Sequence, residues 1–153
     1  MDLWTVCEKG HVHWGTAGGA GLLFRYTPEH GEPTYLLQQR SRSVDYGGLW
    51  GVPGGAIRGG ETPEMAARRE AQEEIGELPP YRVAETEIQD CGGNWKFHIM
   101  IADVDHEFSA FCVRETDAVG WFTLEDMNRL SLHPGLESWL GRNKSRGTQD
   151  RRA

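Results

Sequence analysis

The order of apolar and polar residues predicts strands near the start of the chain. Residues 17–26 and 34–40 are rich in apolar and aromatic side chains, and the segment between them contains two prolines and a glycine. This pattern is typical of two strands joined by a long hairpin loop. Farther along, Pro53, Gly54 and Gly55 interrupt an apolar run and predict a loop or bulge.

A helix is predicted from Thr62 to Ile75. Thr62 can cap its first turn, proline is accepted at the next position, and Gly76 is a typical stop. Apolar residues recur inside it at four-residue spacing, at Ala67, Ala71 and Ile75. A narrow stripe of small side chains of this kind can lie close against a sheet.

Strand-like stretches follow the helix, and short helical segments come after them. The strand-like stretches cover residues 81–90, 95–104 and 110–122, and the helical segments cover residues 124–130 and 136–141. The pattern predicts an α/β architecture with helices packed on a mixed sheet. We expect an N-terminal extension (1–14), one domain (15–142) and a disordered tail (143–153), because the tail has almost no apolar side chains.

Composition excludes several classes of function. The formal net charge of −7 opposes long-range attraction to a nucleic-acid polymer or an anionic membrane. The chain shows neither an export signal nor an apolar run of about 18 residues, so we expect a cytoplasmic protein. Its three cysteines are widely spaced, which favours reduced thiols over a disulfide framework or a zinc site.

Glutamates gather on one side of the predicted helix, at Glu70, Glu73, Glu74 and Glu77. Like charges four residues apart cost roughly 0.2–0.5 kcal/mol per pair, and carboxylates in the last turn oppose the helix dipole. A magnesium ion would offset this repulsion, because Mg²⁺ prefers carboxylate and water oxygens. The alternative is a solvated acidic face, which the spacing alone favours.

Residues 55–77 resemble the Nudix box. Seven positions stand at the box spacing, namely Gly55, Glu61, Arg69, Glu70, Glu73, Glu74 and Gly76. A match of this kind arises by chance in such a chain on the order of once in 10⁵. The chain departs from the box pattern at Ala71 and Glu77, where the family has bulky aliphatic residues. Similarity extends from about Gly15 to about Gly141 and points to an actinobacterial, MutT-like branch.

The resemblance implies a Nudix-type α/β/α sandwich and a Mg²⁺ cofactor, with Mn²⁺ as a substitute. Glu70 and Glu74 would be the principal metal ligands, and the carbonyl of Gly55 would add an oxygen. Glu73 would bind a second metal ion or orient or deprotonate water. Glu61 and Arg69 would form the ion pair that supports the box loop.

An acidic residue from outside the box often completes such a site. Glu115, six residues before Trp121, resembles that position most closely, with Asp117 and Glu107 as alternatives. Glu115 would then be a further metal ligand, and Glu73 and Glu115 both remain candidate bases. An exposed glutamate at a strand end is the other interpretation of Glu115.

A second group of residues could bind the base of a nucleotide. Aromatic rings can stack on a base and polar side chains can hydrogen bond to it, which singles out Trp50, Asn94, Trp95, Phe97 and His98. Packing in the core explains the aromatic members equally well.

The function that we expect is Mg²⁺-dependent hydrolysis of a phosphoanhydride bond in a nucleoside di- or triphosphate or a related derivative. Oxidised guanine nucleotides are one implied substrate. The alternatives are a catalytically silent nucleotide-binding module, a hydrolase of nucleotide sugars or dinucleotide cofactors, and an acidic, metal-stabilised interaction domain. The expected partner is a small nucleotide, and a homodimer is one option for assembly.

Overall fold

The structure is a computed structural model that describes residues 4–6, 10, 12–14, 17–43, 46–92, 95–113 and 115–152, with the backbone alone for residues 4–5, 12–14 and 144–152. Its elements are β1 (Trp4–Val6), β2 (Val12–Trp14), β3 (Gly19–Tyr26), β4 (Thr34–Arg40), β5 (Trp50–Gly51), β6 (Gly54–Ala56), α1 (Pro63–Ile75), β7 (Arg82–Asp90), β8 (Lys96–Val104), β9 (Thr116–Phe122), α2 (Leu124–Met127) and α3 (Pro134–Arg152). The central helix and the strands predicted over residues 17–26, 34–40, 81–90 and 95–104 are confirmed. The strand predicted over 110–122 begins only at Thr116, and residues 54–56, expected in a loop or bulge, form β6 because they pair with β3.

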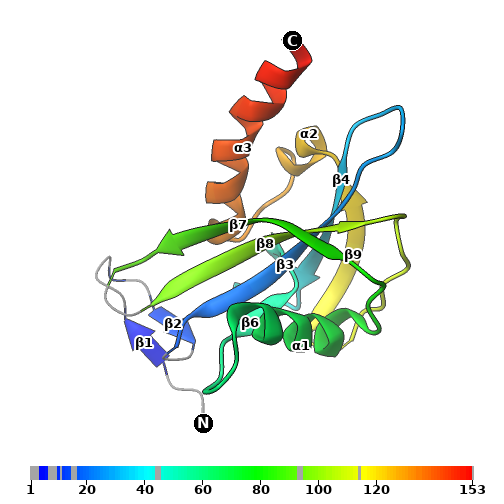
Figure 1. Cartoon of the computed structure of the whole chain (residues 1–153). Coiled ribbons are helices and arrows are strands. Elements are labelled where there is room, and N and C mark those ends of the chain that lie inside the picture. The colour runs from blue at the N-terminus through cyan, green and yellow to red at the C-terminus, as the bar shows by residue number, and fades with distance from the viewer. Residues whose placement is uncertain are drawn as a thin grey trace.

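A seven-stranded mixed sheet forms the centre of the molecule. Its strand order is β5-β4-β3-β8-β7, with β6 paired to β3 and β9 paired to β4. β3 and β8 run parallel, and the other pairs are antiparallel. α1 lies on one side of this sheet and α3 on the other (Figure 1). The predicted α/β/α sandwich is therefore confirmed.

The helix α1 packs closely on the sheet because its inner face is made of small side chains. Ala66, Ala67, Ala71 and Ile75 are fully buried, and they pack with Leu22, Phe24 and their neighbours in one cluster. The Thr62 hydroxyl accepts a hydrogen bond from the Met65 amide, and Gly76 ends the helix with φ of 90°. The expected cap, stop and alanine stripe are all present, so the glutamates of the helix are held beside the sheet.

The opposite face of the sheet packs against α2 and α3. Leu23, Ile99 and Ile101 lie in the same cluster as Met127 and Trp139. α3 begins at Pro134 and its backbone is helical to Arg152. This differs from the sequence expectation of a helix near 136–141 followed by a disordered tail. A helix can continue where its first turns are docked, and Leu136, Trp139 and Leu140 are buried on this face.

The cysteines differ from one another. Cys91 is disulfide-bonded, so the expectation of a reduced thiol is wrong at that position. Cys112 is free and exposed, as expected.

Over the described part of the chain, every helix is too short or too polar to cross a membrane.

Candidate active site beside helix α1

Arg69 joins the loop before α1 to the helix itself. Its Nε and Nη2 donate to the two oxygens of Glu61 at 2.8 and 3.0 Å, and Nη2 also donates to the carbonyl of Ala56 at 3.0 Å. The hydrogen bonds from Arg69 lower the pKa of Glu61 to about 2, with a further contribution from the Arg58 amide. The paired charges therefore keep the loop against the helix at neutral pH.

Glu70 lies directly against the glycine backbone of β6. A Cβ atom added to Gly55 would stand 2.6 Å from Cδ of Glu70, so this position accepts glycine only unless the carboxylate moves. Oε1 of Glu70 also accepts a hydrogen bond from Nη1 of Arg69 at 2.8 Å. Burial raises the pKa of Glu70, and the nearby Arg69 opposes this shift.

Glu74 is the most deeply placed carboxylate of the helix. Its Oε2 accepts hydrogen bonds from Nε2 of Gln38 at 2.8 Å and from the amide of Gly54 at 3.0 Å. Burial raises the pKa of Glu74 to about 8, and the negative charge of Glu70 acts in the same direction. The ionised form of this side chain therefore needs a further positive partner.

Glu73 is more accessible than Glu70, whose side chain is 18% exposed. Its side chain is 29% exposed and its Oε2 lies 3.7 Å from Nη1 of Arg69. The negative charge of Glu73 contributes to the raised pKa of Glu70, so the carboxylates of α1 interact with one another. The Glu73 carboxylate therefore borders Glu70 and remains accessible to solvent.

The donor chemistry of this group fits a divalent cation. Glu70 and Glu74 are held in place, carry raised pKa values and border a glycine backbone that leaves room for close approach. Within the described residues, no three side chains of His, Cys, Asp or Glu converge as a complete site. This is compatible with Mg²⁺, which is usually held by one or two carboxylates together with water and substrate phosphates.

Over the described residues, no hydrogen bond or ion pair joins the side chains of the acidic residues expected to complete the site to this group. Glu115 is exposed, and its backbone carbonyl accepts a hydrogen bond from the Ser41 amide. Asp117 is exposed as well. Glu107 accepts a hydrogen bond from the hydroxyl of Thr34, at the other end of β4 from Gln38. The structure brings together Glu61, Arg69, Glu70, Glu73, Glu74 and Gly55, but it does not bring the Glu115 side chain into contact with them.

The residues expected to bind a base lie on different faces of the sheet. His98 is opposite Ala20 in the register, and Ala20 is opposite Gly55, so the three form one row on the α1 side. Trp50 packs with Phe122 on the α3 side, and Trp95 is buried. Burial and the nearby Lys96 lower the pKa of His98. Asn94 lies outside the described residues.

Trp95 stacks on Phe97, with ring centroids 6.3 Å apart. Phe97 packs against the cluster on the α3 side. These two rings are therefore directed away from the row that leads to Gly55.

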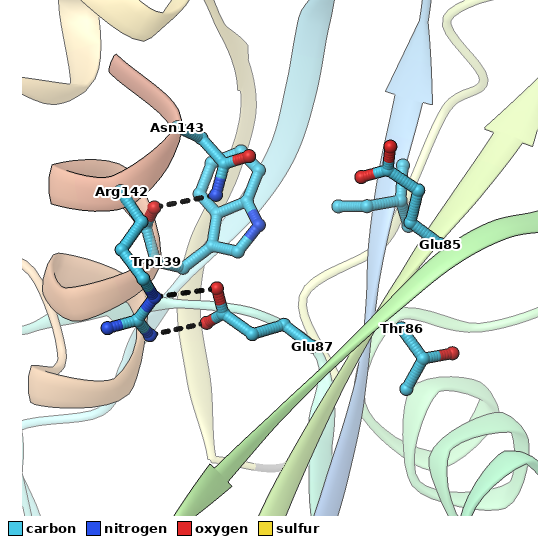
Figure 2. A pocket seen from close by; sticks show the side chains of 7 residues that line it. Glu85, Thr86, Glu87, Trp139, Arg142 and Asn143 are labelled. Carbon is cyan, nitrogen blue, oxygen red and sulfur yellow. Dashed lines mark hydrogen bonds and ion pairs between the residues drawn. The ribbon is translucent and has the colours of Figure 1, made fainter. Parts of the chain in front are cut away.

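A separate groove lies between α3 and the strands β7 and β8. Its volume is about 460 Å³, and it is lined by Glu85, Thr86, Glu87, Ile101, Trp139, Arg142 and Asn143. Figure 2 shows Arg142 of α3 paired with Glu87 of β7 at one side of this groove. None of Trp50, Trp95 and His98 lines it. Because it opens on the face opposite α1, it is not continuous with the carboxylates.

Sequence reasoning missed Gln38 and Thr116. Both are buried, and they connect to Glu74 through hydrogen bonds. A polar residue directly after the apolar run 35–37 of β4 was the only sequence signal for Gln38.

Comparison with known proteins gives consistent matches. The sequence profile of the NUDIX domain matches residues 16–142. A Mycobacterium tuberculosis protein named "Putative 8-oxo-dGTP diphosphatase 3" is 37% identical over 145 residues, which cover 90% of this chain and 67% of that protein. The crystal structure of a Nudix hydrolase from M. smegmatis, RenU, matches with a TM-score of 0.85 and 33% identity, covering 97% of this chain and 96% of that chain.

A more distant match concerns the fold alone. An Ap4A hydrolase from C. elegans has a TM-score of 0.67 at 21% identity, covering 88% of this chain and 99% of that chain. The shared arrangement of sheet and helices is therefore found in proteins whose sequences have diverged widely.

Proposed function

Because this chain belongs to the Nudix family and is a Nudix hydrolase, we propose that it cleaves a phosphoanhydride bond of a nucleoside di- or triphosphate with Mg²⁺ as cofactor. Nudix hydrolases generally use divalent cations, and Mn²⁺ would serve as a substitute. The observation that carries the proposal is the contact between Glu70 and the Gly55 backbone, beside the buried carboxylate of Glu74.

Glu70 and Glu74 would hold the cation, with the carbonyl of Gly55 as a further oxygen. When bound, the cation supplies neutralisation of phosphate oxygens and lowers the pKa of a bound water. The Arg69–Glu61 pair holds the glycine loop, residues 54–61, in a fixed position against α1. It can do so because Arg69 contacts both Glu70 and the carbonyl of Ala56. Support of this kind typically changes metal affinity or activity by about 10- to 100-fold when it is removed.

Glu73 is the better placed of the two candidate bases. Its carboxylate is accessible and lies next to Glu70, whereas Glu115 makes its described contact through its backbone. In the proposed reaction, a water oxygen bonds to phosphorus while the anhydride P–O bond on the opposite side breaks. The water proton passes to a carboxylate oxygen of Glu73, and the departing phosphate or pyrophosphate keeps the electron pair.

The substrate class that we propose is an oxidised guanine nucleotide such as 8-oxo-dGTP. The names of the M. tuberculosis relative and of an "8-oxo-dGTP diphosphatase" from Proteus vulgaris, 50% identical over 41 residues, support this proposal. His98 is the predicted base-binding residue that lies best for it. With strands about 5 Å apart, His98 lies about 10 Å from Gly55 along the sheet row, within the length of a nucleotide.

A panel of nucleotides tests the proposal. Purified protein with Mg²⁺ should release phosphate or pyrophosphate from at least one nucleoside di- or triphosphate or oxidised guanine nucleotide, or a nucleoside monophosphate from a nucleotide sugar or dinucleotide cofactor. Glu70→Gln and Glu74→Gln should each reduce kcat at least about 100-fold while the protein stays folded. Full turnover by both folded variants would contradict the ligand assignment. Binding of a nucleotide without any turnover would favour the silent binding module instead.

The cytoplasmic location and the homodimer, both expected from the sequence, remain predictions.

A further inference from the structure

Two polar side chains are buried in the described core, and both connect to the candidate metal site. Gln38 is 3% exposed and Thr116 is 7% exposed. Burying an amide or a hydroxyl costs free energy unless it is hydrogen bonded. Gln38 follows three buried apolar residues of β4, where another apolar side chain would have avoided this cost.

The two side chains form a chain of hydrogen bonds that ends on Glu74. The Thr116 hydroxyl donates to Oε1 of Gln38 at 3.2 Å, and Nε2 of Gln38 donates to Oε2 of Glu74 at 2.8 Å. An ionised carboxylate only accepts hydrogen bonds, so Gln38 must direct its NH₂ group to Glu74 and its oxygen to Thr116. The carboxylate therefore determines the direction of the amide, and the Thr116 hydroxyl satisfies the amide oxygen by donating to it.

A β-bulge brings Thr116 into this series of hydrogen bonds. β9 pairs with β4 in register from Tyr35 to Gln39, but the register shifts between Gln39 and Arg40, and Arg40 pairs with Thr116. Strict alternation would place Asp117 on the face of Gln38 and Thr116 on the other face. The bulge reverses this, so a hydroxyl meets Gln38 and Asp117 is exposed. Bulges are known to redirect side chains beside active sites.

We propose that Gln38 is a positioning residue for the reaction, held in place by Thr116. Both Gln38 and the Gly54 amide donate to Oε2 of Glu74, so they fix the carboxylate and leave Oε1 as the oxygen that can turn to a cation. Thr116 acts through Gln38, and Gln38 acts through Glu74. This inference rests on the proposed function, because it assigns a purpose to the orientation of a proposed metal ligand.

The test uses Gln38→Met and Thr116→Val, which remove the hydrogen-bonding groups with little change in volume. Gln39→Met is the matched control, because Gln39 is the next residue of the same strand and donates to the Gly48 carbonyl instead. Binding of Mn²⁺ alone, measured by electron paramagnetic resonance of the free ion, reports on Glu74 without turnover. Thermal unfolding of each variant shows that it is folded.

We expect Gln38→Met to weaken Mn²⁺ binding by about tenfold and to lower kcat more than it changes KM. Thr116→Val should act in the same direction with a smaller effect, and it serves as the second variant if Gln38→Met does not fold. Gln39→Met should keep the Mn²⁺ affinity and the kcat of the original protein. A loss of thermal stability alone, with Mn²⁺ affinity unchanged in folded Gln38→Met and Thr116→Val, would overturn the proposal.

The control also separates this inference from the proposed function. An equal loss of Mn²⁺ affinity in Gln39→Met would assign the effect to general destabilisation of β4 and overturn the positioning role. If the unaltered protein neither binds Mn²⁺ nor hydrolyses any nucleotide, the proposed function fails and this inference fails with it. If the unaltered protein is active and the variants match it, only the positioning role fails.

Discussion

Two arginine–glutamate pairs lie on opposite faces of the same sheet, and only one of them belongs to the candidate site. Arg69 and Glu61 beside α1 are 21% and 17% exposed, whereas Arg142 and Glu87 beside α3 are 54% and 23% exposed. Both pairs are bidentate, with distances of 2.8 and 3.0 Å for the first and 2.8 and 2.6 Å for the second. Short bidentate geometry therefore does not by itself distinguish a functional pair.

The difference lies in what else each arginine holds. Arg69 also donates to Glu70 and to the carbonyl of Ala56, so it connects a candidate metal ligand to the glycine loop. Arg142 donates both hydrogen bonds to Glu87 at the side of the α3 groove (Figure 2). Loss of the Arg69–Glu61 pair can therefore displace the candidate metal ligand Glu70. Loss of the Arg142–Glu87 pair affects mainly the packing of α3 on β7.

The largest effect is expected at the glycine loop, which has no counterpart in the α3 groove. In Gly55→Ala the new Cβ would stand 2.6 Å from Cδ of Glu70 and displace the carboxylate. A misplacement of about 1 Å can reduce activity about 100-fold, so we expect kcat to fall on that scale. Phosphate release under saturating nucleotide measures it. Gly59→Ala is the matched control, since a Cβ there meets nothing within 4 Å. Equal kcat for the two variants would argue against close approach at Gly55.

Exchanging one carboxylate of each pair compares the two faces directly. Glu61→Gln should lower kcat on the order of tenfold, because the supporting contact of Arg69 becomes weaker. Glu87→Gln should leave kcat unchanged and lower the free energy of unfolding by at most about 1 kcal/mol, as for an exposed ion pair. Steady-state kinetics and urea unfolding measure the two effects. A loss of activity in Glu87→Gln equal to that in Glu61→Gln would remove the distinction between the faces.

A pH dependence of stability is also expected, and it arises on the α1 side. The pKa of Glu74 is about 8 in the folded protein against an ordinary value of 4.5, because the side chain is buried. Between these values the folded state binds the proton and the unfolded state does not, so the free energy of unfolding falls as pH rises. The slope from this group is at most about 1.4 kcal/mol per pH unit.

Urea unfolding with a chelator between pH 5 and 8, in about half-unit steps, measures this slope. Glu74→Gln isolates the contribution of Glu74, because other titrating groups such as His98 are shared by both proteins. The stability difference between the original protein and Glu74→Gln should shift in favour of the variant as pH rises. A difference that stays constant over this range would show that Glu74 titrates normally. Added Mg²⁺ should reduce the slope of the original protein, because a cation favours the ionised carboxylate.

Local patterns in the sequence were sufficient for the central helix and its acidic side. The Thr62 cap, the Gly76 stop and the buried alanine stripe are as predicted, because helical periodicity relates residues that are close in the chain. The same periodicity places Glu70, Glu73 and Glu74 together, and the resemblance to the Nudix box implied the Arg69–Glu61 pair. The strands β3, β4, β7, β8 and β9 were also predicted in outline from their apolar runs, whereas β5 and β6 were not.

Only the tertiary structure decided which distant residues meet these carboxylates. Gln38 is 36 positions from Glu74 and 78 positions from Thr116, and a β-bulge determines that Thr116 rather than Asp117 faces it. The faces of Trp50 and His98 likewise depend on strand register and on where α3 packs. Apolar and aromatic patterns do not specify the register between strands that are far apart in sequence, and a shift of one residue reverses the face of every side chain.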